Sequence, residues 1–214
     1  MIIAIDGPAA AGKGTLARRI SAHYGLPYLD TGALYRAVGL AMRLAGNDLT
    51  DEETAARVAR DLDLALLEHP DLRSAQAGEA ASRVAAMAGV RAALLDVQRD
   101  FARQPGGAVL DGRDIGTVVC PQADIKLFVT ASPQERARRR WLELRERGEE
   151  AGFDDILAQV MARDARDKAR AEAPLRPAQD AHLLDTSKLD IEAAFREARR
   201  IIGAHHQAGS GRRG

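Results

Sequence analysis

The sequence predicts an α/β protein in which helices cover both faces of a parallel sheet. Short apolar segments alternate with longer segments of helical periodicity along the 214 residues. The short segments contain few polar residues, which is typical of strands that are buried on both sides. This alternation favours one three-layer domain built on five parallel strands.

Glycine, proline or capping residues bound most of the expected elements. Apolar runs predict strands at residues 1–5, 26–29, 108–110, 125–129 and 182–184. Helical spacing of apolar residues predicts the main helices at residues 16–24, 33–45, 90–101, 132–148, 153–170 and 191–202. Residues 61–66 alternate between polar and apolar side chains, which suggests a further short strand.

Composition limits the classes of partner to consider. The 31 basic residues balance the 31 acidic residues, so the chain lacks the charge that bulk binding to nucleic acid or an anionic membrane requires. The single cysteine, Cys120, excludes an internal disulfide and a cysteine metal cluster. We find no signal-peptide pattern and no apolar run of bilayer length. We therefore expect a cytoplasmic monomer that binds small molecules, with neither nucleic acid nor membrane as partner.

A pattern typical of a phosphate-binding loop follows the first expected strand. The segment GPAAAGKGT contains spaced glycines and a lysine, and it leads into a helix. Small residues let backbone N–H groups surround an anion, and the helix N-terminus adds further donors. The residues expected to hold ATP are Gly7, Pro8, Ala9, Ala10, Ala11, Gly12, Lys13, Gly14 and Thr15.

The loop departs from the general pattern at one position. Gly14 stands where a serine or threonine usually follows the lysine, and the hydroxyl comes one residue later, on Thr15. We expect Lys13 to reach the β- and γ-phosphates of ATP and Thr15 to bind Mg²⁺. The order GKGT resembles the loop of nucleoside monophosphate kinases more than that of switch GTPases. The alternative is an alanine- and glycine-rich turn without function.

Polar residues follow each expected strand, and in a parallel sheet they meet at one edge, where ligands bind. Thr31 stands at a helix N-terminus with Arg36 about one turn further on, which suits an anion, although a helix cap with a solvated arginine is the alternative. The segment Asp111–Asp114 combines a glycine with an arginine for phosphate and a carboxylate that can accept from a base amine. A tight turn with a local ion pair is the alternative there.

A stripe of arginines marks the helix expected at residues 153–170. Arg163, Arg166 and Arg170 fall three and four residues apart, with Asp167 among them, so they share one side of the helix. Like charges on one stripe repel unless an anion lies opposite. A solvated face paired with Asp164 and Asp167 is the alternative.

Taken in order, GPAAAGKGT, LDTGALYR, LDGRDIGTVV and RDARDKARAEAPL resemble the corresponding segments of bacterial cytidylate kinases, which are nucleoside monophosphate kinases of the P-loop class. The resemblance implies a P-loop kinase core over residues 1–203, with a monophosphate-binding insert at about 61–90 and a helical lid at about 139–170. Residues 204–214 would form a disordered tail. Segment 66–71 is too short for the small antiparallel sheet that the family's insert usually carries.

The resemblance also implies an activity, which is Mg²⁺-dependent transfer of the γ-phosphoryl group of ATP to CMP or dCMP. Carried over by motif, the positions that would contact CMP are Thr31, Arg36, Ser82, Arg91, Arg113, Asp114, Arg163, Asp167 and Arg170. The catalytic positions would be Lys13, Arg113, Arg163 and Arg170, and the lid residue Arg139 would contact ATP. Two other functions stay open from the residues alone. One is a kinase for UMP, AMP or shikimate, and the other is a nucleotide-dependent switch protein.

Overall fold

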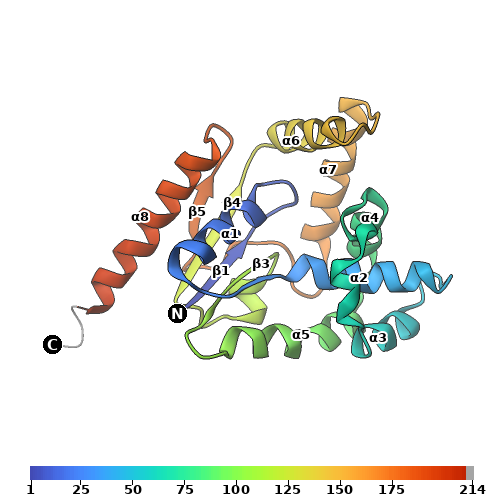
Figure 1. The fold of residues 1–214 in the computed structure, drawn as a ribbon, viewed down its shortest axis with the longest axis horizontal. Coiled ribbons are helices and arrows are strands. Elements are labelled where there is room, and N and C mark those ends of the chain that lie inside the picture. The colour runs from blue at the N-terminus through green and yellow to red at the C-terminus, as the bar shows by residue number, and fades with distance from the viewer. Residues whose placement is uncertain (211–214) are drawn as a thin grey trace.

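The computed structural model describes residues 1–210 and contains one five-stranded sheet (Figure 1). All neighbouring strands pair in parallel, in the order β2-β3-β1-β4-β5. The strands are β1 (Ile2–Asp6), β2 (Tyr28–Asp30), β3 (Ala108–Gly112), β4 (Ile125–Thr130) and β5 (His182–Asp185). This arrangement confirms the predicted fold class and the five predicted strands.

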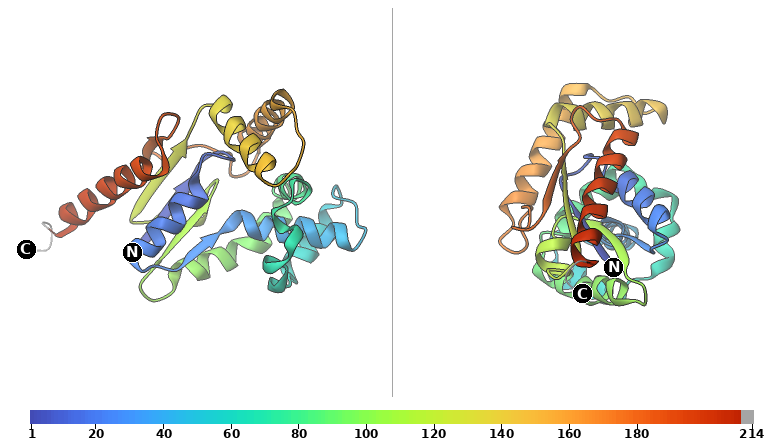
Figure 2. Two further views of the ribbon diagram at one scale, coloured as in Figure 1. Left: turned by 45° about the horizontal axis from the view of Figure 1, so that its top comes forward. Right: turned by 90° about the vertical axis from the view of Figure 1, so that its left-hand side faces the viewer.

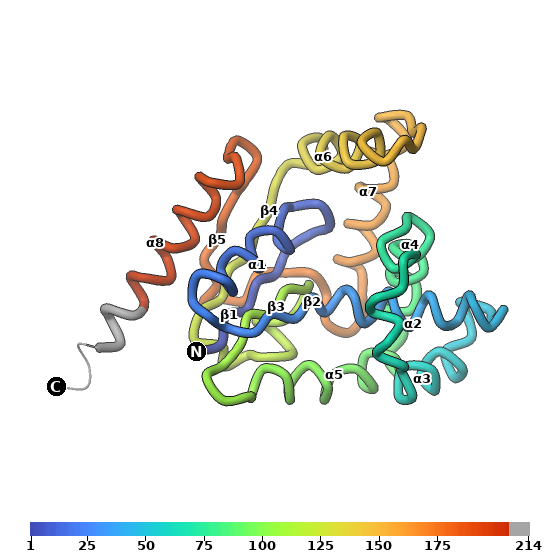
Figure 3. Tube along the Cα trace, in the orientation of Figure 1, coloured from blue at the N-terminus to red at the C-terminus, as the bar shows by residue number. Residues whose placement is uncertain are grey.

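Helices connect the strands, and their path is followed most easily in the tube of Figure 3. They are α1 (Lys13–Tyr24), α2 (Thr31–Leu44), α3 (Glu52–Arg60), α4 (Ala75–Val84), α5 (Ala88–Arg103), α6 (Pro133–Glu146), α7 (Phe153–Ala169) and α8 (Ile191–Ser210). Short 3₁₀ turns cover Leu64–Glu68 and Pro70–Arg73, and a π-helical turn covers Ile115–Val119.

Helices cover both faces of the sheet (Figure 2), and an apolar cluster lies on each face. On one face, Ile3 and Ile5 of β1 pack with Ile20 of α1 and Ile202 of α8. On the other face, the cluster is formed by alanine and leucine residues of β1 and β3 with side chains of α5 and the π-helical turn. Strands buried on both sides explain why their sequences read as apolar runs rather than as alternating patterns.

Two helical units stand beside the carboxyl ends of the strands. Helices α2, α3 and α4 form one unit, at the right of Figure 1, which the start of α5 joins, and α6 with α7 forms the other, at the top. The second unit has its own small core of Ala137, Leu144, Ile156 and Val160. The expected insert at 61–90 and the expected lid at 139–170 fall within these units, and both assignments stay predictions.

The strand predicted at residues 61–66 is wrong. Asp63 caps a 3₁₀ turn by accepting a hydrogen bond from the Ala65 N–H at 2.9 Å, and the segment joins no sheet. Alternation of polar and apolar residues cannot supply the neighbouring strand that pairing requires. Residues 61–90 contain no strand at all, in agreement with the expected lack of a small antiparallel sheet.

The predicted tail needs correction for its first part. Helix α8 continues to Ser210, because no proline or glycine interrupts the chain immediately after residue 203. Residues 211–214 lie outside the described residues, so the prediction for them is untested. Within the described part of the chain, every helix is too short or too polar to cross a bilayer.

A glycine allows α2 and α4 to approach each other closely, and the contact generates a stability prediction. A Cβ atom on Gly39 would lie 2.8 Å from the Cβ of Ala80. We expect Gly39→Ala to lower the free energy of unfolding by about 1–3 kcal/mol, because the helices must separate. Urea unfolding of Gly203→Ala is the matched control, since a Cβ at this helical position meets nothing within 4 Å. The control should be stabilised by about 0.5–1 kcal/mol through helix propensity alone. A higher free energy of unfolding for both variants would contradict the close contact between Gly39 and Ala80.

Candidate active site

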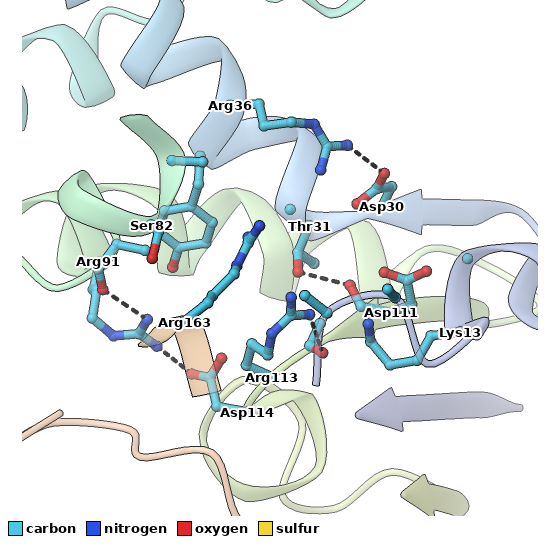
Figure 4. A pocket seen from close by; sticks show the side chains of 18 of the residues that line it. Lys13, Asp30, Thr31, Arg36, Ser82, Arg91, Asp111, Arg113, Asp114 and Arg163 are labelled. Carbon is cyan, nitrogen blue, oxygen red and sulfur yellow. Dashed lines mark hydrogen bonds and ion pairs between the residues drawn. The ribbon is translucent and has the colours of Figure 1, made fainter. Parts of the chain in front are cut away.

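A pocket of about 240 Å³ opens beside the carboxyl ends of β1, β2 and β3 (Figure 4). Most of the positions predicted from the sequence line it, namely Ala9, Ala10, Lys13, Gly14, Thr31, Arg36, Ser82, Arg91, Arg113, Asp114, Arg163 and Arg170. The other predicted positions lie outside its lining, namely Gly7, Pro8, Ala11, Gly12, Thr15, Arg139 and Asp167. Residues from both helical units and from the sheet edge therefore converge on one space.

The loop between β1 and α1 has the shape of an anion cradle. Gly12, with a φ of 86°, and Ala10, with a φ of 59°, adopt left-handed backbone conformations that curl the chain. A Cβ on Gly7 would lie 1.9 Å from the carbonyl oxygen of Val129, so only glycine fits there. The Nζ of the buried Lys13 donates to the carbonyl oxygen of Pro8 at 3.3 Å. The lysine is thus held across its own loop.

Lys13 lies in an environment that disfavours its charge. Burial, and to a smaller extent the nearby Arg113, lower the pKa of Lys13 to about 8, although Asp111 and Asp30 oppose the shift. An anion bound in the loop would raise this pKa again, because opposite charges stabilise the ionised form.

The packing around Gly14 explains the unusual order GKGT. A Cβ at Gly14 would lie 3.3 Å from Oδ2 of Asp111 and 3.6 Å from the hydroxyl of Tyr28. Tyr28 donates a hydrogen bond to the same Asp111 oxygen at 2.9 Å. A serine or threonine would crowd this pair, so the hydroxyl stands instead on the exposed Thr15. The sequence marked Asp111 only as a strand-end residue, and the strand register that brings Tyr28 near it was not predictable.

Asp167 organises the arginines that enter the pocket from α7 and from the loop after β3. Its carboxylate accepts from Nε of Arg113 at 3.0 Å and from Arg170 on the other oxygen. Although burial raises the pKa of Asp167, Arg113, Arg170 and Arg163 together hold it below the usual range. The stripe therefore faces the pocket at Arg163 and Arg170, whereas Arg166 turns to Glu79 of α4 at 2.7 Å.

Arg163 contributes positive charge that no carboxylate matches directly. Its Nε is buried and has no hydrogen-bond partner. Burial lowers the pKa of Arg163 to about 10, and Arg113 is the next cause. Figure 4 shows the side chain extended between Ser82 and Arg113. A buried donor of this kind is costly unless a ligand accepts from it.

Thr31 and Arg36 lie at the start of α2, at the side of the pocket near the phosphate loop. Arg36 donates to Asp30 at 2.7 Å, while its Nε is buried without a partner. Thr31 donates to the carbonyl oxygen of Asp111 at 2.7 Å. The residue that caps α2 is Asp30, through the Ala33 N–H at 3.1 Å, and not Thr31. Arg36, however, lines the pocket rather than open solvent.

Ser82, Arg91 and Asp114 form the opposite end of the pocket. Asp114 pairs with Arg91, which comes from α5, rather than with the adjacent Arg113. Burial raises the pKa of Asp114, and Arg91 opposes that shift. The hydroxyl oxygen of Ser82 is buried and has no partner. This end can offer a carboxylate, a guanidinium and a hydroxyl to a flat polar ligand.

Arg139 lies outside the pocket, beside the phosphate loop. It donates to the carbonyl oxygen of Thr186 at 2.7 Å and, more weakly, to that of Ala11 at 3.5 Å. A Cβ on Gly12 would lie 3.6 Å from its Nη1. Arg139 thus joins α6 to the outer side of the loop, where it is 28% exposed.

One edge of the parallel sheet carries a lysine-bearing phosphate loop and, next to it, the pocket that several arginines line. Proteins built in this way are phosphate-loop kinases, which hold a donor on the loop and an acceptor beside it. Comparison with known proteins narrows the class. The model of the family described as cytidylate kinase matches residues 3–203, so the chain belongs to the cytidylate kinase family. This result confirms the resemblance seen in the sequence.

Curated relatives match the sequence over nearly the whole length of this chain. A cytidylate kinase from Xanthobacter autotrophicus is 63% identical over 95% of this chain and 98% of its own length. One from Methylocella silvestris is 59% identical over 97% of this chain and 96% of its own length. An uncharacterized protein from Eubacterium ventriosum, 14% identical, superimposes with a TM-score of 0.56 over 95% of this chain and 98% of that one, which shows the fold alone.

Family membership makes the protein a phosphotransferase that phosphorylates CMP or dCMP with ATP. The predicted activity is therefore confirmed. The comparisons favour neither a kinase for UMP, AMP or shikimate nor a switch protein.

The unpartnered hydroxyl of Ser82 allows a stability test in the free protein. We expect Ser82→Ala to leave the free energy of unfolding unchanged or higher, because it removes a buried polar group that has no partner. Ser74→Ala in the same helix is the matched control, since its hydroxyl caps α4 through the Ala77 N–H at 3.1 Å. Chemical denaturation should show a loss of about 1 kcal/mol for the control only. A similar loss for Ser82→Ala would mean that its hydroxyl is satisfied within the fold.

Proposed function

We propose that the pocket holds CMP or dCMP while the phosphate loop holds ATP, so that the γ-phosphoryl group passes directly between them. The observation that carries this assignment is a set of buried polar atoms without partners, on Arg36, Ser82 and Arg163. All of them belong to residues that line the same pocket. Buried polar groups are normally satisfied, so their convergence favours a polar, anionic ligand.

The donor side consists of residues 7–15 and Arg139. Backbone N–H groups of the loop would surround the β- and γ-phosphates, and Lys13 would turn from the Pro8 carbonyl to the phosphate oxygens. Arg139, which contacts the loop from α6, would lie against the rest of ATP.

Mg²⁺ fits the donor side, because an exposed hydroxyl on Thr15 at the start of α1 is the hard oxygen ligand that this ion accepts. ATP phosphates and water would complete its coordination. When bound, Mg²⁺ would neutralise part of the charge that develops on the phosphates.

The acceptor side divides into parts with different chemistry. Thr31, Arg36, Arg113 and Arg170 would hold the phosphate of CMP, because they lie at the side of the pocket near Lys13 or pair around Asp167. Arg163 and Asp167 would meet the ribose. Ser82, Arg91 and Asp114 would read cytosine, whose exocyclic amine suits a carboxylate acceptor.

The transfer itself needs no general base. A phosphate oxygen of CMP, already anionic, attacks the γ-phosphorus of ATP, the bond to the β,γ-bridging oxygen breaks, and ADP leaves. Lys13, Arg113, Arg163 and Arg170 would align the two phosphates and offset their repulsion. Helices α6 and α7 would exclude water, and the Arg166–Glu79 ion pair, at 2.7 Å, links this lid to α4.

We further propose that the protein acts as a monomer in the cytoplasm. The balanced charge gives no attraction to an anionic membrane or to nucleic acid.

The lowered pKa of Lys13 predicts that the protein takes up protons when ATP binds. In the free protein the pKa of Lys13 is about 8, so a fraction of the lysine is neutral slightly above that pH. Phosphate raises the pKa, and ATP binding at about pH 8.5 should therefore take up protons. Calorimetry in buffers of different ionisation enthalpy measures this uptake. Lys13→Met should abolish both the uptake and the turnover, whereas Lys168→Met, at an exposed lysine, should keep both. Undiminished uptake in Lys13→Met would refute the role of Lys13.

Asp114 generates a prediction about the base. Asp114→Ala should lower the ratio of kcat/KM for CMP to that for UMP, because uracil has a carbonyl where cytosine has an amine. The expected loss of discrimination is about 1–3 kcal/mol. Asp180→Ala is the control, because it breaks a lysine–carboxylate pair with Lys126 outside the pocket. A variant that keeps the wild-type ratio and loses only ATP affinity would move Asp114 to the donor side.

A further inference from the structure

Asp6, the last residue of β1, forms a buried connection that the proposed reaction does not use. The residue is 4% exposed and does not line the pocket. Its carboxylate accepts hydrogen bonds from the N–H groups of Ile115 and Gly116, each at 2.7 Å. These bonds span 109 and 110 positions of the chain.

The two N–H groups depend on Asp6 because they begin a short helical turn. Within the turn Ile115–Val119, the later N–H groups of Val118 and Val119 bond back to the carbonyl of Asp114. The first N–H groups of a helical turn have no such partner within it. A carboxylate is a strong acceptor for both at once.

The position of this connection is informative. On one side, Asp6 directly precedes Gly7, the first residue of the phosphate loop. On the other side, Ile115 directly follows Arg113 and Asp114, which we assign to the phosphate and the base of CMP. Strand pairing also sets Asp6 opposite Gly112. One side chain thus links the start of the donor loop to the acceptor loop.

The electrostatics of Asp6 agree with that placement. Burial raises the pKa of Asp6 to about 6, and the hydrogen bonds from Gly116 and Ile115 oppose the shift. Asp114 raises the pKa further, whereas Lys13 lowers it. The carboxylate therefore interacts with charged groups on both the acceptor and the donor side.

We propose that Asp6 is a positioning residue that fixes the segment carrying Arg113 and Asp114 relative to the phosphate loop. It acts through the backbone of Ile115 and Gly116 and touches neither substrate. The inference rests on the proposed roles of Arg113 and Asp114. Transfer between two bound phosphates is sensitive to displacements of about 1 Å, so a loosened acceptor segment impairs the reaction even when ATP binds normally.

The test compares Asp6→Asn with Asp124→Asn. Asn at position 6 keeps the size of the side chain but replaces one acceptor by an amide that faces an N–H group. Asp124 is the matched control, because its carboxylate accepts from the Ile2 N–H at 2.7 Å, at the opposite end of the same strand. For each variant we measure kcat and KM for CMP and UMP, the affinity for ATP without acceptor, and the urea midpoint.

In Asp6→Asn, kcat/KM for CMP should fall by about tenfold or more, as expected for the loss of a charge-assisted hydrogen bond. The preference for CMP over UMP should fall with it, while the affinity for ATP changes by less than about twofold. Asp124→Asn should keep the wild-type kcat/KM for CMP, the preference for CMP over UMP and the affinity for ATP. Unchanged kcat/KM in Asp6→Asn, or an equal loss in CMP and ATP binding, would overturn the positioning role.

If Asp6→Asn does not fold, a second variant, at Gly116, disturbs the same contact between Asp6 and the turn. A Cβ on Gly116 would lie 3.1 Å from Cδ of Lys126 and 3.4 Å from Oδ2 of Asp6. Gly116→Ala should therefore show the same selective loss for CMP, and a wild-type profile in a folded Gly116→Ala protein would overturn the proposal.

The Asp114→Ala variant tests the base site independently of Asp6. If that variant keeps its CMP preference, the assignment of the base site fails, whatever Asp6 does.

Discussion

Parallel pairing of β1 with β3 on one side and β4 on the other is the constraint on which the rest of the molecule depends. Because parallel strands end at the same edge, the phosphate loop after β1 and the segment Asp111–Asp114 after β3 lie side by side. Helices α1 and α8 bury one face of the strands and α5 the other. The apolar core thereby fixes the geometry of a pocket in which several charged side chains converge.

The site itself works against the stability of the free protein. Arginines crowd around the single carboxylate of Asp167, and buried nitrogens of Arg36 and Arg163 stay without partners. Burial opposes the charge of Lys13 and of Arg163, and it favours the neutral form of Asp114. In the proposed function, two anionic nucleotides would supply the missing acceptors and charge. The excess of positive charge that disfavours the free site would then hold the two phosphates close together.

The arginines in and next to α6 and α7 make three different kinds of contact. Arg163 and Arg170 enter the pocket, whereas Arg166 bridges to Glu79 on α4 and Arg139 holds the outer side of the phosphate loop. Side chains of one type thus reach the pocket, a neighbouring helix and the loop between β1 and α1. Their periodicity alone predicted a shared face but not this division.

The sequence by itself determined the strands, the phosphate loop and the family, because apolar runs, glycine spacing and the segment DGRDIGTVV depend on local order along the chain. The wrong strand at 61–66 shows the limit of local patterns, since pairing needs a distant partner. Only the tertiary structure decided that Asp114 pairs with Arg91, that Tyr28 and Asp111 pack closely against Gly14, and that Asp6 binds the turn at Ile115. Each of these contacts joins residues far apart in the chain, and their meeting is fixed by strand order and packing, which no local pattern encodes.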